Sequence, residues 1–244
     1  MGCASNRNQH GFTLVEIAIV MIIIGLLIGG TFGVMKLIEN MQVNRTIQDL
    51  KSIDSAALTF KDTYGRLPGD IVNPAARLPS CTTAPCSTAG NGDRRISPTR
   101  FEVAWDAPQN VAYERFTFWS HLQAANLLAL TSKNTTDMNF GEGQPEAGVD
   151  GGYRLTEYTG LGGCNYTTFA NGIVLVVTDP VLVISDPAVS QVPCTQVRAI
   201  DNKIDDGQPT LGRVAGNGGC ISDTTCAATY VINSVGHVFY DAKF

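Results

Sequence analysis

The side chains that most often carry out catalysis are sparse in this sequence and lie far apart. The three histidines are His10, His121 and His237, and this spread disfavours a metal centre built from several histidines. Ser120 precedes His121, but the sequence around it lacks the G-x-S-x-G elbow of a hydrolase nucleophile. The sequence also lacks a phosphate-binding loop, a dinucleotide fingerprint and a signature of paired catalytic carboxylates. We therefore expect a protein that is not an enzyme and that needs no cofactor.

A cluster of acids near the carboxyl end is the main candidate for a metal site. Asp201, Asp205 and Asp206 lie close together in the sequence, as calcium ligands often do. A loop of the EF-hand type would need an acid and a glycine where Lys203 and Asp206 stand. On a helix, Asp201 and Asp205 would instead share one solvated face. We therefore expect no metal here, with calcium as the alternative, and a solvated loop for the second acidic string at 142–150.

Glu16 is the only charged residue in the segment 12–35, FTLVEIAIVMIIIGLLIGGTFGVM. A helix of this length, at about 1.5 Å per residue, crosses the ~30 Å hydrocarbon core of a bilayer. The alternative is a secretory signal peptide that is removed. However, the residues before this segment carry little positive charge, and no small-x-small cleavage site follows the apolar segment. An acid in a membrane span either reaches the headgroups or has a cationic partner. The span contains no lysine or arginine, so a partner has to come from elsewhere.

The string GFTLVE at 11–16, followed by the long apolar run, resembles the class III signal of type IV pilins and type II secretion pseudopilins. In that family the prepilin peptidase cuts after the glycine and methylates the new amino-terminal phenylalanine. The resemblance implies cleavage between Gly11 and Phe12, and it supplies the missing cation. Glu16 would neutralise the Phe12 ammonium of a neighbouring subunit during filament assembly. Major pseudopilins also use a calcium loop, which keeps the calcium alternative open.

The helix is expected to continue beyond the membrane as an amphipathic segment. Apolar residues recur there at steps of three and four, which predicts one buried stripe: Val43, Ile47, Leu50, Ile53, Ala57, Phe60 and Tyr64. Gly65 and Pro68 predict the end of this helix, and the segment 60–70 resembles the helix exit of pseudopilins. We therefore divide the chain into a cleaved leader (1–11), a membrane or filament-core half (12–35), an amphipathic half (36–64) and a globular head (65–244).

The head is predicted to mix helices and strands, which makes the fold class α+β with a pilin-like antiparallel sheet packed on the long helix. Proline, serine and glycine between 71 and 112 predict a surface excursion. The remaining pattern predicts a helix at 113–130, a polar loop at 131–152, strands at 172–178 and 181–185, a helix at 193–207 and one or two closing strands within 229–244.

Cleavage of the leader would remove Cys3 and leave six cysteines: Cys81, Cys86, Cys164, Cys194, Cys220 and Cys226. An even number on the translocated side predicts three disulfides, for which 15 pairings exist in principle. Short loops favour Cys81–Cys86 and Cys220–Cys226, and Cys164–Cys194 then follows by elimination. Zinc is the alternative, but the sequence has neither a second C-x-x-C nor a nearby histidine pair.

The preferred hypothesis is a structural subunit of a pilus or pseudopilus. Its partners would be the prepilin peptidase, inner-membrane lipid and other pilin subunits, and it would assemble into a helical filament. It would be a single-pass protein of the bacterial inner membrane with its head in the periplasm. With a net charge of −5, nucleic acid is not expected as a partner. The alternatives are a minor pilin that binds DNA or a surface, through a patch at Arg94, Arg95 and Arg100, and a membrane-anchored enzyme.

Overall fold

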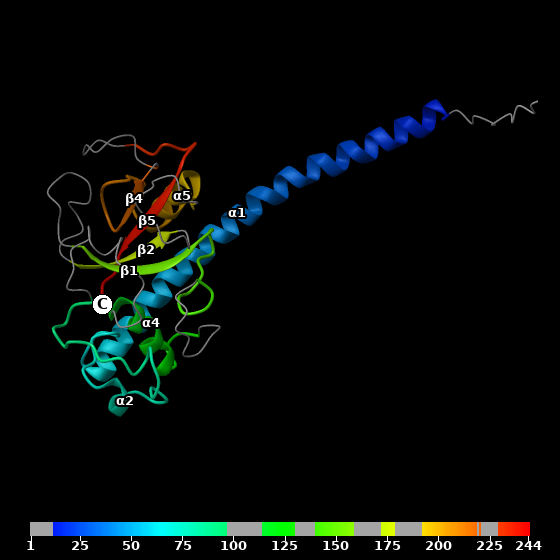
Figure 1. Cartoon of the computed structure of the whole chain (residues 1–244). Coiled ribbons are helices and arrows are strands. Elements are labelled where there is room, and N and C mark those ends of the chain that lie inside the picture. Colours follow the sequence, from blue (N-terminus) through cyan, green and yellow to red (C-terminus); the bar gives the residue numbers. More distant parts are fainter. Residues whose placement is uncertain are drawn as a thin grey trace, which may run out of the picture. The chain divides into compact units, whose positions relative to one another are not determined.

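The computed structural model describes residues 12–96, 114–129, 140–158, 172–178, 192–218, 220 and 229–244. Its backbone divides into two compact units, an amino-terminal unit (Met1–Asn40) and a carboxy-terminal unit (Met41–Phe244). Helices and an antiparallel sheet share the carboxy-terminal unit, which confirms the predicted α+β class. Figure 1 shows α4, α5 and the strands β1, β2 and β5 of this unit.

Helix α1 (Leu14–Tyr64) is the longest element and ends at the residue that the sequence predicted. Gly65 follows with a φ of 71°, a conformation that favours glycine, and its N–H donates to the Lys61 carbonyl at 2.8 Å. In the part of the chain that the structure describes, α1 is also the one helix long and apolar enough to cross a membrane. This agrees with the membrane segment expected at 12–35.

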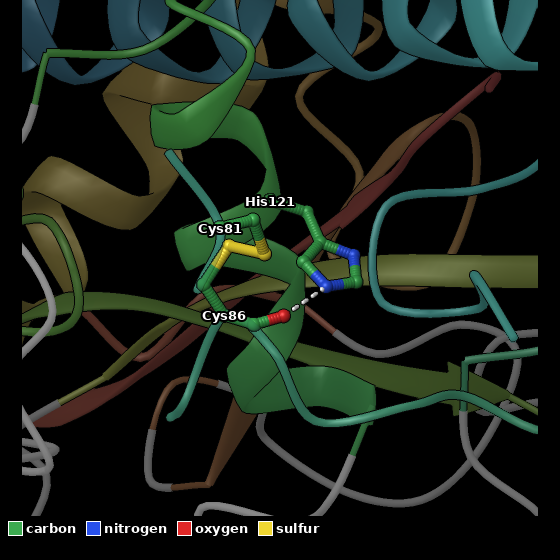
Figure 2. A group of neighbouring side chains, drawn as sticks. All are labelled: Cys81, Cys86 and His121. Atoms are coloured by element: carbon green, nitrogen blue, oxygen red, sulfur yellow. Dashed lines mark hydrogen bonds between the residues drawn. A yellow bond between two sulfur atoms is a disulfide. The ribbon is translucent and has the colours of Figure 1, made fainter. Parts of the chain in front are cut away.

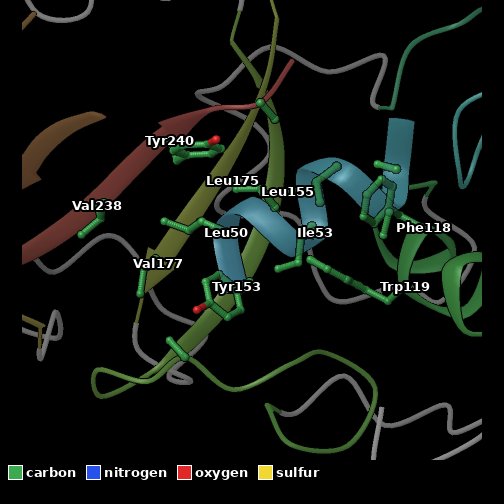
Figure 3. Close-up of a cluster of buried hydrophobic side chains, with 14 of the residues drawn as sticks. Leu50, Ile53, Phe118, Trp119, Tyr153, Leu155, Leu175, Val177, Val238 and Tyr240 are labelled. Carbon is green, nitrogen blue, oxygen red and sulfur yellow. The ribbon is translucent and has the colours of Figure 1, made fainter. Parts of the chain in front are cut away.

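Six of the seven residues of the predicted stripe on the carboxy-terminal part of α1 are buried, and Tyr64 is half-buried. Leu50, Ala57 and Phe60 are fully inaccessible to solvent, and Val43, Ile47 and Ile53 are nearly so. Figure 3 shows side chains of α1 between the sheet and α4 (Glu114–Ala124), with Trp119 on the α4 side. The 3.6-residue period of the sequence therefore correctly predicts which side of α1 packs in the core.

Strand β5 (Val235–Asp241) lies at the centre of the sheet. It pairs antiparallel with β2 (Gly172–Thr178), with the short β3 (Val192–Pro193) and with β4 (Val214–Gly218). β1 (Gly152–Tyr158) pairs with β2 and completes the five-stranded sheet. The structure confirms the predicted strand at 172–178 and a closing strand, whereas the strand predicted at 181–185 lies outside the described residues. Neither β1 nor β4 is among the predicted strands.

Two predictions about the segments around α4 need correction. The part of 71–112 that the structure describes is mostly exposed, as expected of a surface excursion, but Ile71, Leu78 and Ile96 anchor it in the core and it includes the short helix α2 (Pro74–Arg77). The helix predicted at 113–130 is shorter than expected and ends at Ala124. The chain turns there with Asn126 at a φ of 55°, so the later leucines reach the core from a loop.

Helix α5 (Cys194–Ile204) is close to its prediction. Pro193 precedes it with extended backbone, and Val197 and Ile200 on its inner face are completely buried. Gly207 follows with a φ of 74°, as a residue beyond a helix end commonly does. β3 leads directly into α5, so the start of this helix is fixed by the pairing of β3 with β5.

Candidate functional site

Helix α1 begins with a reciprocal pair of hydrogen bonds between Thr13 and Glu16. The backbone N–H of Glu16 donates to Thr13 Oγ1 at 3.3 Å, and Glu16 Oε2 accepts from the backbone N–H of Thr13 at 2.9 Å. The Thr13 hydroxyl also donates to Glu16 Oε2 at 2.9 Å. This arrangement is a capping box, which satisfies backbone N–H groups that the first turn of a helix otherwise leaves unpaired. Glu16 therefore stabilises the start of its own helix.

The role of Thr13 is not among the predictions above, which concern Glu16 alone. The signal was available, because a threonine followed three residues later by a glutamate, just before an apolar run, is the sequence pattern of a capping box. Phe12 lies next to this box and is exposed, with 84% of its surface accessible. Gly11, the other residue of the predicted cleavage site, lies outside the described residues.

The amino-terminal unit presents an apolar surface on every side of α1. Every large apolar side chain that the structure describes between positions 12 and 40 is exposed, from Phe12 and Leu14 to Leu37 and Ile38. A helix that is apolar all round is stable only inside a large core, a membrane or a bundle of similar helices. Glu16 is the only charge in positions 12–35, so it is the side chain that such surroundings would disfavour most.

The structure confirms one predicted disulfide and corrects the other two. Cys81 is bonded to Cys86, as the short loop predicted. Cys194 is bonded to Cys220, with the two Cα atoms 5.2 Å apart, so the assignments Cys220–Cys226 and Cys164–Cys194 are wrong. Cys164 and Cys226 lie outside the described residues.

The sheet explains why Cys194 and Cys220 meet. Val192 of β3 and Gly218 of β4 both pair with Gly236 of β5, so the residues just beyond these strands come close together. Their separation of 26 residues in the sequence hid this proximity. Loop length favours Cys220–Cys226 instead, and no local pattern in the sequence predicts β4.

His121 is a packing residue in the core. Its ring is fully buried, and its Nδ1 accepts a hydrogen bond from the Gly69 N–H at 2.8 Å. The proton is therefore on Nε2, which donates to the Cys86 carbonyl at 3.0 Å (Figure 2). Burial lowers the pKa of His121 to about 4. Both ring nitrogens are occupied and Ser120 donates to the Thr117 carbonyl, so these residues do not form a nucleophile–base pair.

The acids at the end of α5 do not share a solvated face. Asp201 is completely buried; its carboxylate accepts from the Tyr230 hydroxyl at 2.8 Å and from the Gly207 N–H at 3.3 Å. Burial raises the pKa of Asp201 to about 7. Asp205 is exposed as predicted, and Asp206 is exposed as well. The prediction was wrong for Asp201 because Tyr230, which lies near it only in the fold, covers it.

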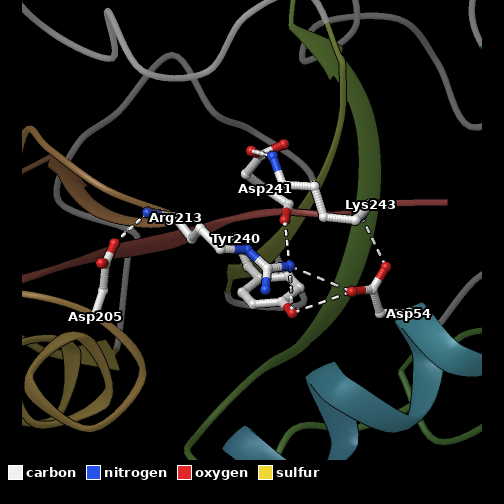
Figure 4. Close-up of polar contacts among 6 residues, drawn as sticks. All are labelled: Asp54, Asp205, Arg213, Tyr240, Asp241 and Lys243. Atoms are coloured by element: carbon white, nitrogen blue, oxygen red, sulfur yellow. Dashed lines mark hydrogen bonds and ion pairs between the residues drawn. The ribbon is translucent and has the colours of Figure 1, made fainter.

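A polar network joins α1 to the end of the chain (Figure 4). Arg213 Nη2 lies 3.3 Å from Asp54 Oδ2, and it donates to the Tyr240 hydroxyl at 2.9 Å and to the Asp241 carbonyl at 3.1 Å. The N–H of Lys243 donates to Asp54 Oδ1 at 2.8 Å. Every member of this network has a structural partner, so we assign it the role of fastening the last strand to α1.

The predicted basic patch is not uniformly basic where the structure describes it. Arg94 follows Asp93, and its backbone N–H donates to Asp70 at 2.9 Å. The carboxylates of Asp70 and Asp93 lie in one cluster with that of Glu114. Arg100 lies outside the described residues. The described part of this patch therefore has carboxylates beside its arginines, of which Asp93 is exposed like Arg94 and Arg95.

Comparison with known proteins identifies the start of the chain. Residues 6–32 match the family model described as the prokaryotic N-terminal methylation motif. No curated protein and no solved structure matches the chain. The matched residues include the capping box and the first turns of α1.

Proposed function

Because residues 6–32 carry the prokaryotic N-terminal methylation motif, the signal of type IV pilins and pseudopilins, we propose that this chain is the precursor of a structural filament subunit. The prepilin peptidase would cut after Gly11 and methylate the amine of Phe12. The subunit would then join others in a type IV pilus or a type II secretion pseudopilus through the apolar part of α1. The observation that carries the proposal is the matched motif, placed at the start of a helix whose apolar side chains are all exposed.

The geometry at the start of α1 supports the role proposed for Glu16. The hydrogen bonds from Thr13 both end on Oε2 of Glu16. The other oxygen, Oε1, can therefore accept from an ammonium group while the capping box stays intact. Cleavage before Phe12 would create such a group, and an ion pair in apolar surroundings would offset the cost of burying the carboxylate. Glu16 would thus cap its own helix and pair with the amino terminus of a neighbouring subunit.

The exposed apolar surface supports a membrane location before assembly. A segment of this length and hydropathy matches the thickness of a bilayer. We place the protein in the bacterial inner membrane, as a single-pass protein with its head in the periplasm, where disulfides such as Cys81–Cys86 and Cys194–Cys220 form. A structural role of this kind needs no catalytic site.

The test is the intact mass and amino-terminal sequence of the protein from a bacterium that has the prepilin peptidase. We expect a chain that begins at Phe12 and carries one additional methyl group. A chain that begins at Met1 in such a host would refute the proposal.

Two substitutions separate the two roles of Glu16. Glu16→Gln keeps an acceptor for the capping box but removes the charge, so we expect cleavage without incorporation into sheared filaments. Thr13→Val removes the capping hydroxyl but keeps the charge, so we expect a chain that is still cut and still assembles. Filaments of Glu16→Gln at the wild-type yield would refute the ion pair and leave the cleavage reasoning intact.

A further inference from the structure

The carboxy-terminal unit has a hollow beside α1 in which positive charges outnumber negative ones. Its volume is about 490 Å³, and half of its eight lining residues are charged. Lys51 and Asp54 belong to α1, Arg213 precedes β4, and Lys243 follows β5. Figure 4 shows part of it. We call it the basic hollow, and its lining consists of Lys51, Asp54, Ser55, Leu58, Ile204, Arg213, Tyr240 and Lys243.

Lys51 is the charge of the basic hollow that the described chain leaves unpaired. Arg213 lies 3.3 Å from the Asp54 carboxylate, and Lys243 forms an ion pair with Asp241. Lys51 is exposed, and its side chain has no hydrogen bond or ion pair among the residues that the structure describes. Its ammonium group is therefore available to a partner outside this chain.

A second hollow beside α1 has the opposite balance of charge. Its volume is about 220 Å³, and its charged groups are one arginine and two carboxylates. Asp49 Oδ2 accepts from the Tyr153 hydroxyl at 3.2 Å and lies 3.8 Å from Arg45 Nε. Glu146 is exposed, and its side chain has no hydrogen bond or ion pair within the described ranges. We call this the acidic hollow, and its lining consists of Arg45, Asp49, Ser52, Ile53, Leu128, Ala129, Gly141, Pro145, Glu146 and Tyr153.

The two hollows lie on opposite sides of α1. Asp49 and Lys51 are two residues apart on this helix, so at about 100° per residue their side chains point about 160° apart. The sheet agrees with this arrangement. Tyr153 of the acidic hollow is on β1 and Tyr240 of the basic hollow is on β5, and these strands lie on either side of β2 (Figure 3).

These two surfaces complement each other between copies of the chain. An exposed charge alone needs no partner, but here Lys51 and Glu146 have opposite signs and lie in separate hollows. Complementary charges on two surfaces favour one relative orientation of the partners. A contact between two different surfaces of identical chains can repeat without closing, and such contacts generate helical filaments.

We propose that the basic hollow of one copy docks on the acidic hollow of the next copy, with Lys51 paired to Glu146 across the contact. This inference rests on the proposed filament function, in which the apolar part of α1 holds the copies together. Small-molecule sites are lined mostly by apolar side chains, whereas half of the lining of the basic hollow is charged. A protein surface of opposite charge therefore fits it better than a small ligand does.

The test is cross-linking with a carbodiimide, which joins a lysine amine directly to a carboxylate in contact with it. The full chain is produced as two variants, Lys51→Gln and Glu146→Gln, in one host that has the prepilin peptidase. In that host Lys51 and Glu146 are present only on different copies. A cross-linked peptide that contains both residues can therefore arise only from a contact between copies. We expect this peptide in the membrane and filament fractions, and its absence would overturn the docking.

Exchange of the two charges tests the same pair by filament yield. Lys51→Glu and Glu146→Lys should each lower the yield of sheared filaments about fivefold, and the double variant should restore it. Asp150→Lys is the matched control, because Asp150 is exposed in the same acidic segment but does not line the hollow. Combined with Lys51→Glu, it should give no recovery. Equal recovery with Asp150→Lys and with Glu146→Lys would overturn the pairing.

The amino-terminal sequence of the same samples separates this inference from the proposed function. Chains that begin at Phe12 and form filaments without the cross-link would overturn the docking and leave the filament role intact. Chains that begin at Met1 would refute the filament role. In such chains the cross-link would still support the contact between copies, and its absence would overturn that contact as well.

Discussion

Acidification from pH 6.5 to pH 4 is expected to destabilise the carboxy-terminal unit through His121. This side chain is fully buried, and it accepts from Gly69 through Nδ1 and donates to Cys86 through Nε2. A second proton on the ring would have to displace the Gly69 N–H, because Nδ1 would then be a donor as well. The folded protein therefore accommodates the neutral ring of His121 better than the protonated ring.

The size of the effect follows from the pKa of His121. Its value of about 4 in the folded chain compares with 6.5 for an unperturbed histidine. The unfolded chain takes up the proton first as the pH falls, so the contribution of His121 is complete above pH 6.5 and is lost progressively towards pH 4. The difference of about 2.5 in pKa corresponds to about 3 kcal/mol of unfolding free energy.

Asp201 acts in the opposite direction over nearly the same range. Burial raises its pKa to about 7 from 3.8, so the folded chain takes up this proton first. Its contribution to stability is complete below pH 3.8 and is lost as the pH rises towards 7. The contributions of His121 and Asp201 should therefore largely cancel each other between pH 4 and pH 6.5. Burial also raises the pKa of Asp49 and Asp70, which act in the same direction as Asp201.

Two substitutions separate the contributions of His121 and Asp201 to the pH dependence of stability. Urea unfolding of the full chain in micelles is measured from pH 4 to pH 7.5 for wild type, Asp201→Asn and His121→Gln, with His237→Gln as a control on the half-buried histidine of β5. Between pH 6.5 and pH 4, Asp201→Asn should lose about 3 kcal/mol of unfolding free energy relative to wild type, because the opposing contribution of Asp201 is removed while that of His121 remains. His121→Gln should gain stability on acidification. Identical pH profiles for these two variants would refute the reasoning.

Three further predictions concern packing, the corrected disulfide and the turn after α1. Leu50→Ala should cost about 3 kcal/mol in urea unfolding, whereas Leu58→Ala on the exposed side of α1 (46% exposed) should cost about 0.5 or less. A non-reducing peptide map should show Cys194 linked to Cys220, and replacing both by serine should cost about 3.5 kcal/mol, given a loop of 26 residues. Gly69→Ala should cost about 2 kcal/mol or more in urea unfolding, because its φ is 91° and its Cβ would lie 2.4 Å from the carbonyl oxygen of the first residue of α4.

The parts of the fold that the sequence predicted are those with a local signal. The buried stripe of α1 and its end at Gly65 follow from a 3.6-residue period and one glycine, and both can be read along the chain. β1 is not predicted, because only Tyr153 and Leu155 alternate with polar residues there and the polar, glycine-rich segment 131–152 precedes them. β4 carries glycines that weaken a strand pattern, and Gly216 is needed because Tyr230 packs within 2.7 Å of its missing Cβ.

The candidate sites likewise divide into those with a local signal in the sequence and those without one. The capping box of Thr13 and Glu16 spans four residues, so the sequence contained all that was needed to predict it. The partner of Cys194 could not be predicted in this way, because it depends on two strands that meet only at β5. The cluster at Asp70 likewise depends on close contacts of Gly69 and Gly90 between segments that are distant in the sequence. Such long-range contacts leave no pattern of fixed spacing.

The two parts of α1 differ in what covers them. This difference indicates which residues would favour the proposed filament over the membrane. The stripe from Val43 to Phe60 is covered by the chain itself, whereas the apolar side chains of the amino-terminal unit are exposed. Lipid and neighbouring helices are about equally apolar, so exchanging one for the other gains little from the hydrophobic effect. Glu16 is different, because its charge costs up to about 3 kcal/mol in lipid and can be paired with a Phe12 ammonium in a filament. On this reasoning Glu16, and not the apolar area, favours the filament over the membrane, which is why Glu16→Gln should lower filament yield while leaving the apolar surface unchanged.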